Sequence, residues 1–203
     1  MKNSVKTDLN MILKKNFLLT PFRYIDGFKA LAAGLIILAV SGLLAFSIQF
    51  RYDGFLDFHG APEPDYLYLL DPFINWIIFA LLASFTGLLY KRPFRVIDML
   101  GMTAVAFFPN ILSPPIAYIF GLSGILPLIT DTPLIDIPKV IGPYMLQLLL
   151  SSFLMLAVTI WFIYLTFQAF QTNLNLKKTQ SIIIYILLLI ITEIITVSIL
   201  RSY

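Results

Sequence analysis

Long blocks of apolar residues, separated by short polar segments, dominate the chain. The blocks cover residues 28–50, 73–90, 96–129, 140–170 and 181–200. A transmembrane helix needs about 20 predominantly apolar residues to cross the hydrocarbon core of a bilayer. The pattern therefore predicts an all-α fold, a polytopic membrane helical bundle of about five transmembrane helices.

The third block is too long for one crossing, and Pro109 and the pair Pro114 and Pro115 interrupt it. We expect one crossing by a broken or kinked helix, followed by a shallow apolar piece that ends before Thr130. Backbone groups freed at a break have to be covered by protein or line a water-filled cavity. Because such breaks mark substrate sites in transporters, Asn110 is a candidate binding residue.

Polar segments set the domain organisation. Residues 1–26 are basic and amphipathic, without the features of a removable signal peptide, and we expect them on the anionic cytoplasmic surface. Residues 51–71 are acidic and aromatic and contain Pro62 and Pro64, which predicts an extramembrane loop. We find no internal repeat and no linker, so residues 27–203 are expected to form one five-span transmembrane domain.

The composition excludes several classes of protein. Hydrophobic residues make up 59% of the 203 positions and charged residues only 12%, whereas soluble domains carry about 25% charged residues. The net charge of +3 does not indicate nucleic-acid binding, because the basic residues flank the apolar blocks instead of forming one basic surface. Cysteine is absent, which rules out disulfides, thiolate metal sites and a cysteine nucleophile.

The distribution of charge predicts the orientation. Eleven of the fourteen Lys and Arg residues lie in the N-terminal region, after the second block or after the fourth block. Only Arg51, Lys139 and Arg201 lie on the other side, where most of the acidic residues are found. The positive-inside rule then places the N-terminus in the cytoplasm and the C-terminus outside. The expected location is the cell inner (cytoplasmic) membrane.

Glu193 is the only carboxylate well inside a predicted span. A charged residue there costs roughly 2.5–3.5 kcal/mol on insertion scales, so its side chain is expected to face a partner or a wet cavity. Two interpretations remain open. Glu193 is either a structural carboxylate, hydrogen-bonded to a neighbouring helix, or a proton or cation site in a transport cycle. Thr196 and Tyr185 share its helical face.

Asp98 and Gln147 complete the set of candidate binding residues. Asp98 lies in the first turn of the third span, three residues after Arg95, which favours an anchor at the helix start. Gln147 belongs to a polar stripe with Tyr144 and Ser151 on the fourth span. Such a stripe lines a pathway in some proteins, but hydrogen bonding between helices is its commoner role.

A short segment after the first span combines two carboxylates with the only histidine of the chain. Asp53, Asp57 and His59 offer three oxygen or nitrogen ligands for a divalent metal on the outer face. Their spacing matches no established metal signature. An ordered interfacial turn is therefore the preferred interpretation, and no cofactor is predicted.

No complete catalytic set is visible in the sequence. Residues 121–124 (GLSG) have the Gly-x-Ser-Gly form found around the nucleophile of some intramembrane proteases. Such an enzyme needs a histidine base on a later span, and His59 lies upstream in a loop. The sequence thus predicts a protein that is not an enzyme.

Several short motifs in order along the chain carry a family resemblance. They are FLLTPFR at 17–23, RYDGFLDFH at 51–59, RVIDMLG at 95–101, FQAFQTNLNLK at 167–177 and IITEI at 190–194. With them the chain resembles the Yip-domain (Ypt-interacting protein) membrane family in its compact bacterial form. The resemblance implies a five-helix bundle with a cytoplasmic N-terminus. Eukaryotic relatives bind small Rab-type GTPases and shape membranes in vesicle traffic.

Two functional hypotheses follow. The first is a non-enzymatic integral membrane protein of the Yip type, a membrane-organising or protein-interaction (adaptor) bundle. Its expected partners are the lipid bilayer and a membrane protein or a second copy of the chain, and no nucleic acid. The alternative is a small ion-coupled transporter or permease that uses Glu193 and the broken third span.

Overall fold

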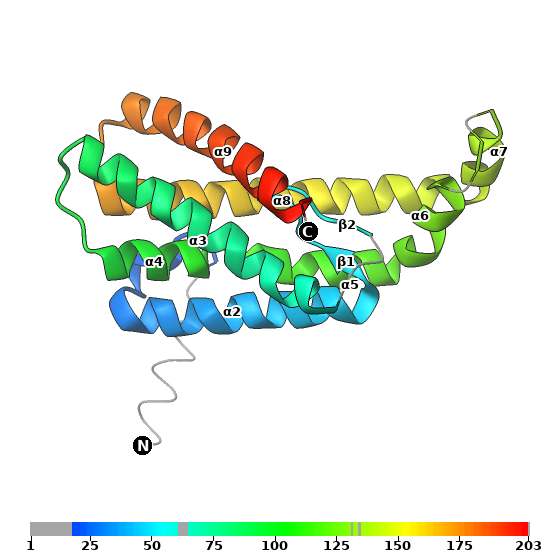
Figure 1. Ribbon diagram of the computed structural model, residues 1–203, viewed down its shortest axis with the longest axis horizontal. Helices are drawn as coiled ribbons and strands as arrows, with labels where there is room; N and C mark the ends of the chain where they lie inside the picture. The colour runs from blue at the N-terminus through cyan, green and yellow to red at the C-terminus, as the bar shows by residue number, and fades with distance from the viewer. Residues whose placement is uncertain (1–17, 61–64, 131, 134, 203) are drawn as a thin grey trace, which may run out of the picture.

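The computed structural model describes residues 18–60, 65–130, 132–133 and 135–202. Five segments of the described chain are long and apolar enough to cross a membrane. Four of them contain the long helices α2 (Gly27–Ile48), α3 (Asp65–Leu89), α8 (Met145–Leu174) and α9 (Lys178–Leu200), which lie side by side around shorter helices (Figure 1). The predicted all-α bundle with five spans is thereby confirmed.

The third span is broken, as its prolines predict. It consists of α4 (Val96–Val105), the 3₁₀ helix η2 (Phe108–Leu112) and α5 (Ser113–Ile119). Proline has no N–H to donate and disfavours the helical conformation of the residue before it, so the helix is interrupted at Pro109. The shallow piece expected after this crossing is the separate helix α6 (Leu122–Thr130). Over its apolar stretch 61% of the residues are buried, against 22% in the spans that contain α8 and α9, so this span lies at the centre of the bundle.

The first and third spans approach closely because small residues line their contact. A Cβ atom added to Gly34 would lie 2.3 Å from Cβ of Ala104, and one added to Gly101 would lie 2.7 Å from the Leu31 nitrogen. Small residues allow helix backbones in a membrane to come together in this way. The contact fixes the start of α2 beside the start of α4, where Asp98 lies.

The prediction of an extramembrane loop over residues 51–71 is wrong in its second half. Helix α3 begins at Asp65 and includes Pro72, so the segment before the apolar block is already helical. The physical reason is that Asp71, fully buried, pairs with Arg51 (2.8 Å). A paired carboxylate can be buried inside a protein, so the charge at this position does not mark an exposed loop.

Short helical segments also precede α2 and α8. A short connection of α7 (Ile137–Ile141) and the 3₁₀ helix η3 (Gly142–Tyr144) leads into α8, which therefore starts later than the predicted block. The 3₁₀ helix η1 (Pro21–Arg23) precedes α2. Most of the predicted amphipathic N-terminal segment, residues 1–17, lies outside the described residues.

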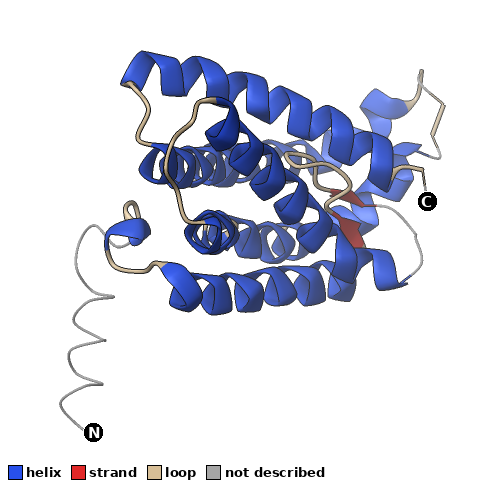
Figure 2. Cartoon of the chain, turned by 60° about the vertical axis from the view of Figure 1, so that its left-hand side comes forward, coloured by secondary structure: helices blue, strands red, loops and turns tan. Residues whose placement is uncertain are grey.

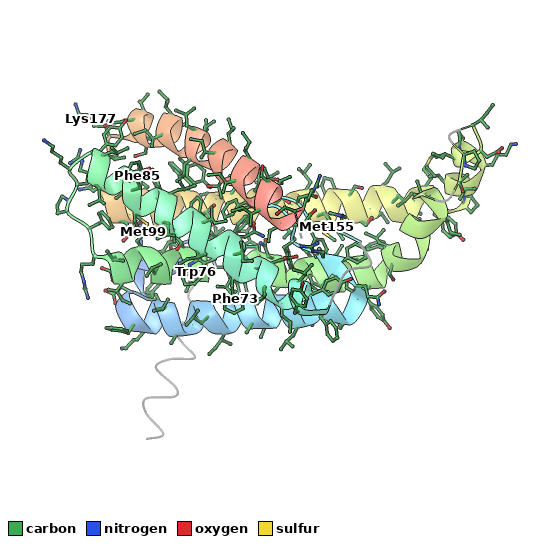
Figure 3. All side chains as sticks on the ribbon, viewed as in Figure 1. Phe73, Trp76, Phe85, Met99, Met155 and Lys177 are labelled. Atoms are coloured by element: carbon green, nitrogen blue, oxygen red, sulfur yellow. The ribbon has the colours of Figure 1, made fainter. Side chains whose placement is uncertain are left out.

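Most basic residues of the described chain gather at one end of the bundle. The loop between α3 and α4 carries Lys91, Arg92 and Arg95, and the link between α8 and α9 carries Lys177 (Figure 3). The opposite end, which we call the hairpin end, holds the acidic segment after α2 and the last residues of α9. This separation of charge agrees with the predicted orientation.

A short antiparallel hairpin occupies the hairpin end. Strand β1 (Phe50–Arg51) pairs with β2 (His59–Gly60), in the register Phe50 with Gly60 and Arg51 with His59. The loop that joins the strands turns back between the helices (Figure 2). We call residues 50–60 the hairpin. The sequence predicted an ordered turn here, and the structure shows that this turn enters the bundle.

Candidate functional site

Phe55 at the tip of the hairpin fills the middle of the bundle. Its side chain is 3% exposed. Its ring lies 4.8 Å from that of Phe79 on α3, 5.6 Å from that of Phe107 in the third span and 5.0 Å from that of Phe162 on α8, measured between ring centres. Aromatic pairs at these separations add to the free energy gained by burying the rings. The first half of the hairpin, through Phe55, is therefore a packed part of the core, whereas its second half reaches the surface.

Helix α9 binds the main chain of the hairpin tip. The Leu56 N–H donates a hydrogen bond to Oε2 of Glu193 (2.8 Å), and the Phe55 N–H donates one to Oγ1 of Thr196 (3.0 Å). A Cβ atom added to Gly54 would lie only 2.7 Å from Oε1 of Glu193, so glycine permits this close approach. The predicted candidate Glu193 thus holds the hairpin, together with Thr196 on the same helical face.

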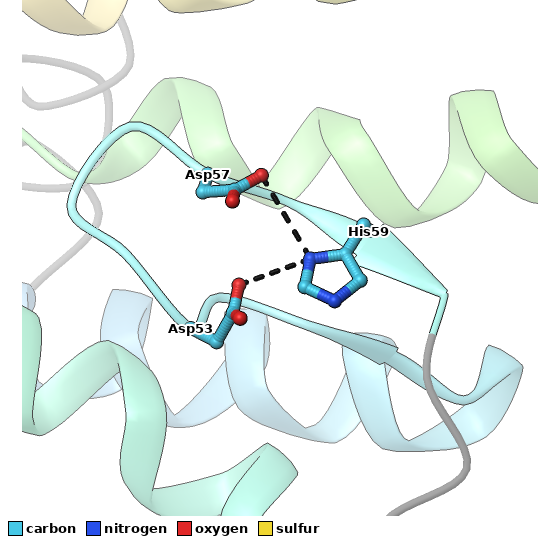
Figure 4. A group of neighbouring side chains, drawn as sticks. All are labelled: Asp53, Asp57 and His59. Carbon is cyan, nitrogen blue, oxygen red and sulfur yellow. Dashed lines mark ion pairs between the residues drawn. The ribbon is translucent and has the colours of Figure 1, made fainter. Parts of the chain in front are cut away.

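A second set of contacts, made by charged side chains, joins the hairpin to the end of α9. Arg201 donates hydrogen bonds from Nε to Oδ2 of Asp53 (2.8 Å) and from Nη2 to Oδ2 of Asp57 (2.6 Å). The Nδ1 atom of His59 lies 3.0 Å from Oδ1 of Asp53 and 3.8 Å from Oδ1 of Asp57 (Figure 4). The three residues that the sequence singled out are thus brought together, and Arg201 joins them.

The electrostatics of this group favour charged side chains. Burial opposes ionisation of Asp53, but His59 and Arg201 outweigh it, and they hold the pKa of that carboxyl below its usual value. The neighbouring His59 likewise lowers the pKa of Asp57. In turn Asp53, and then Asp57, raise the pKa of the His59 imidazole to about 9. At neutral pH the group contains two carboxylates and two cations.

Arg51 in the first strand of the hairpin forms a buried ion pair with Asp71 on α3. Arg51 donates from Nε to Oδ2 of Asp71 (2.8 Å) and from Nη2 to Oδ1 of the same residue (3.1 Å). The Nη2 atom also donates to the main-chain oxygen of Leu200 at 3.2 Å. The pair thus connects β1, α3 and the end of α9. A guanidinium with two parallel bonds to a carboxylate is among the stronger hydrogen-bonded arrangements in proteins.

Asn110 meets the hairpin through its backbone. The Tyr52 hydroxyl donates to the Asn110 main-chain oxygen (2.6 Å), and the Asn75 side chain donates to the Tyr52 main-chain oxygen (2.6 Å). One carbonyl at the break in the third span is therefore covered by protein. This is one of the two arrangements that the sequence led us to expect at the break.

The other two candidate residues lie away from the hairpin. Asp98, at the basic end, accepts a hydrogen bond from the Gly27 N–H (2.9 Å) and lies 3.5 Å from Nε of Arg95. This geometry is that of the predicted helix-start anchor. Gln147 is exposed near the start of α8, whereas Ser151 on the same helical face is buried, so the predicted polar stripe is exposed only in part.

Sequence reasoning missed several residues that build this site, among them Phe55, Gly54 and two arginines. Arg51 and Arg201 appeared in the sequence only as charges on the outer side, and Gly54 had no role. The sequence did offer one clue to the two arginines: they lie on the side of the membrane that carries most of the carboxylates, and arginines there are candidates for ion pairs with them. Their partners lie up to 149 positions away, and no local spacing identifies them.

The five apolar spans define the class of this chain, a multi-pass integral membrane protein. Comparisons with protein-family models, with curated proteins and with solved structures find no match.

Proposed function

We propose that the chain is a non-enzymatic membrane protein of the Yip type that acts as an adaptor, binding another membrane protein through its transmembrane helices. One observation carries the proposal: the tip of the hairpin fills the bundle beside Glu193, and its main chain binds that carboxylate. The carboxylate that first suggested transport thus has a structural role in this arrangement.

The filled interior favours an adaptor over a transporter. A transport pathway needs polar groups around a water-filled route across the bundle. The place next to Glu193 is instead taken by Gly54 and Phe55, and Phe55 packs into a cluster of aromatic rings. A cavity of about 170 Å³ does lie near the basic end, but it is lined by apolar side chains and by none of the polar candidates. The packed space beside Glu193 and the apolar lining of the cavity both support a bundle without a transport pathway.

The first half of α8 offers a surface for a partner helix. It extends beyond the rest of the bundle, beside α6 (Figure 1). Its exposed side chains are mostly large and apolar, including Leu146, Leu150 and Phe153, and the amide of Gln147 lies exposed among them. An amide exposed among apolar side chains gains a hydrogen bond when another helix packs over it. We infer that Gln147 contacts the partner.

Site-specific photo-crosslinking in cells tests this proposal. A photoreactive amino acid replaces Leu150, one helical turn from Gln147, at native expression level. The matched control carries it at Ile36, which is 64% exposed on α2. We expect one membrane protein, or a second copy of the chain, to be captured at position 150 and not at position 36. Adding Gln147→Leu should reduce that capture several-fold.

Two results would contradict the adaptor. One is capture that is equal at both positions and insensitive to Gln147→Leu. The other is a substrate flux into vesicles containing the purified protein that Glu193→Gln abolishes while the protein stays folded. The second result would favour the ion-coupled transporter instead.

A further inference from the structure

Arg201 and His59 divide the oxygens of two carboxylates between them. Arg201 binds the Oδ2 atoms of both Asp53 and Asp57. The Oδ1 atoms of the same two residues face Nδ1 of His59, at 3.0 and 3.8 Å (Figure 4). One arginine therefore orients both carboxylates so that one oxygen of each points towards the same imidazole nitrogen.

The Oδ1 atom of Asp53 has a close neighbour but no hydrogen bond. The Asp53 side chain is 4% exposed, and within the described part of the chain no donor is aligned with this buried oxygen. Buried carboxylate oxygens in proteins nearly always have a hydrogen-bond partner, a bound water or an ion. Two carboxylate oxygens and an imidazole nitrogen gathered this closely can also share a metal ion, which takes the place of the imidazole proton.

We propose that Asp53, Asp57 and His59 form a binding site for a divalent transition-metal ion, through Oδ1, Oδ1 and Nδ1 respectively. These three ligand atoms all lie within 4.8 Å of one another. Ligands at about 2.0–2.2 Å from a zinc ion are roughly 3–3.5 Å apart, so a small rotation of Asp57 completes the set. One imidazole and two carboxylates suit zinc or manganese, whereas magnesium and calcium sites are built from oxygen alone.

The surroundings of the three residues suit a cation. Metal binding displaces the proton that His59 carries at neutral pH, and with the imidazole neutral the two carboxylates and Arg201 leave one net negative charge. Hydrogen bonds to the second oxygen of a ligating carboxylate fix its orientation in metal sites, and Arg201 provides them here. Asp57 and His59 are 38% and 40% exposed, which gives the ion access. Three protein ligands leave a further coordination position for water or a partner group.

Metal titration of the full-length protein in lipid nanodiscs tests the site. The protein is stripped with a chelator and titrated calorimetrically with zinc chloride and with manganese chloride, and the bound metal is measured after desalting. We expect about one zinc ion per chain and weaker binding of manganese, following the usual affinity order. Asp57→Asn should weaken zinc binding at least tenfold, because even residues that only support a ligand contribute about 10- to 100-fold.

Two further variants make the result specific. Asp136→Asn is the matched control, since Asp136 is another exposed carboxylate in an ion pair, 3.0 Å from Lys139, and it should leave the affinity unchanged. His59→Asn removes the imidazole and leaves both contacts of Arg201 in place, and it should also weaken binding at least tenfold. Size-exclusion profiles verify that each variant is folded. No bound zinc, or equal affinity in all four proteins, would overturn the proposal and leave these residues as an ion-pair cluster.

Discussion

The carboxylate of Glu193 accepts a hydrogen bond from the main-chain N–H of Leu56, a residue 137 positions earlier in the chain (2.8 Å). An acidic side chain inside a membrane span is costly unless it finds a partner. Here the partner is the backbone of an inserted hairpin. This relationship explains why the carboxylate and the hairpin occur together, and it leads to the first two predictions.

Substitutions of Glu193 should separate its structural role from a transport role. Glu193→Ala leaves the Leu56 N–H without its acceptor. We expect a loss of about 1 kcal/mol, since both groups are partly exposed. For a chain of this length that loss corresponds to a melting temperature lower by about 2–4 °C. Glu193→Gln keeps an acceptor oxygen and should cost less. Thermal unfolding in nanodiscs measures both, and a larger loss for Gln than for Ala would contradict the assigned hydrogen bond.

Gly54 should not tolerate a side chain. A Cβ atom there would lie 2.7 Å from Oε1 of Glu193 and 2.9 Å from Cγ2 of Val197, so either these side chains or the hairpin tip has to shift. We expect Gly54→Ala to destabilise the protein by about 1–3 kcal/mol, as overpacking does. Gly124→Ala is the control, because nothing lies within 4 Å of its added Cβ. Gly124 is in helix α6, where alanine is favoured by about 0.5–1 kcal/mol. Equal melting temperatures for the two variants would show that the tip is not tightly packed.

The buried pair of Arg51 and Asp71 should show strong coupling. Removing one partner leaves an uncompensated buried charge, at a cost of about 3–5 kcal/mol. Arg51→Met and Asp71→Leu should each be strongly destabilised, and the double variant should recover much of the loss. A double-mutant cycle of unfolding free energies measures the coupling. Additive losses in the cycle would mean that the two side chains do not act as a pair.

The contribution of His59 to stability should depend on pH. The carboxylates of Asp53 and Asp57 raise its pKa from 6.5 in the unfolded chain to about 9 in the folded protein, with Arg201 and Glu193 as the other charged groups nearby. The folded state therefore binds a proton more tightly. The contribution is fully present below pH 6.5 and is lost as the pH rises through 9.

The measurement compares melting temperatures at pH 7 and pH 9.5 in buffer containing a chelator. The wild-type protein should lose more stability over this range than His59→Asn, because the variant has no imidazole to titrate. Parallel profiles for the two proteins would show that the ion pair contributes nothing to folding.

The spans could be predicted from the sequence, but the contacts between the hairpin and the helices around it could not. Apolar blocks reveal helices that cross a membrane because lipid imposes a minimum length and excludes unpaired polar groups. The prolines likewise revealed the break in the third span. These features are local in the sequence, and short windows are enough to find them.

The prediction from sequence was wrong or incomplete where a charged residue pairs with a residue far away along the chain. Asp71 looked like part of a loop, because hydropathy cannot distinguish an exposed carboxylate from one bound to Arg51. Asp53, Asp57 and His59 were recognised as a group since they are close in sequence. The partners Glu193 and Arg201 belong to the last helix, and only the packing of the bundle brings them to the hairpin.

The connection between the hairpin and the last helix also sets an order of events during synthesis. Asp53 emerges from the ribosome 148 residues before Arg201. At about 5–20 residues per second, the acidic turn waits roughly 7–30 seconds for its basic partner. Throughout that interval the tip with Phe55 has no α9 to bind. Insertion of α9 is therefore the step that fixes an earlier segment in place, and a nascent chain stalled before it would leave the hairpin end open to quality-control proteases.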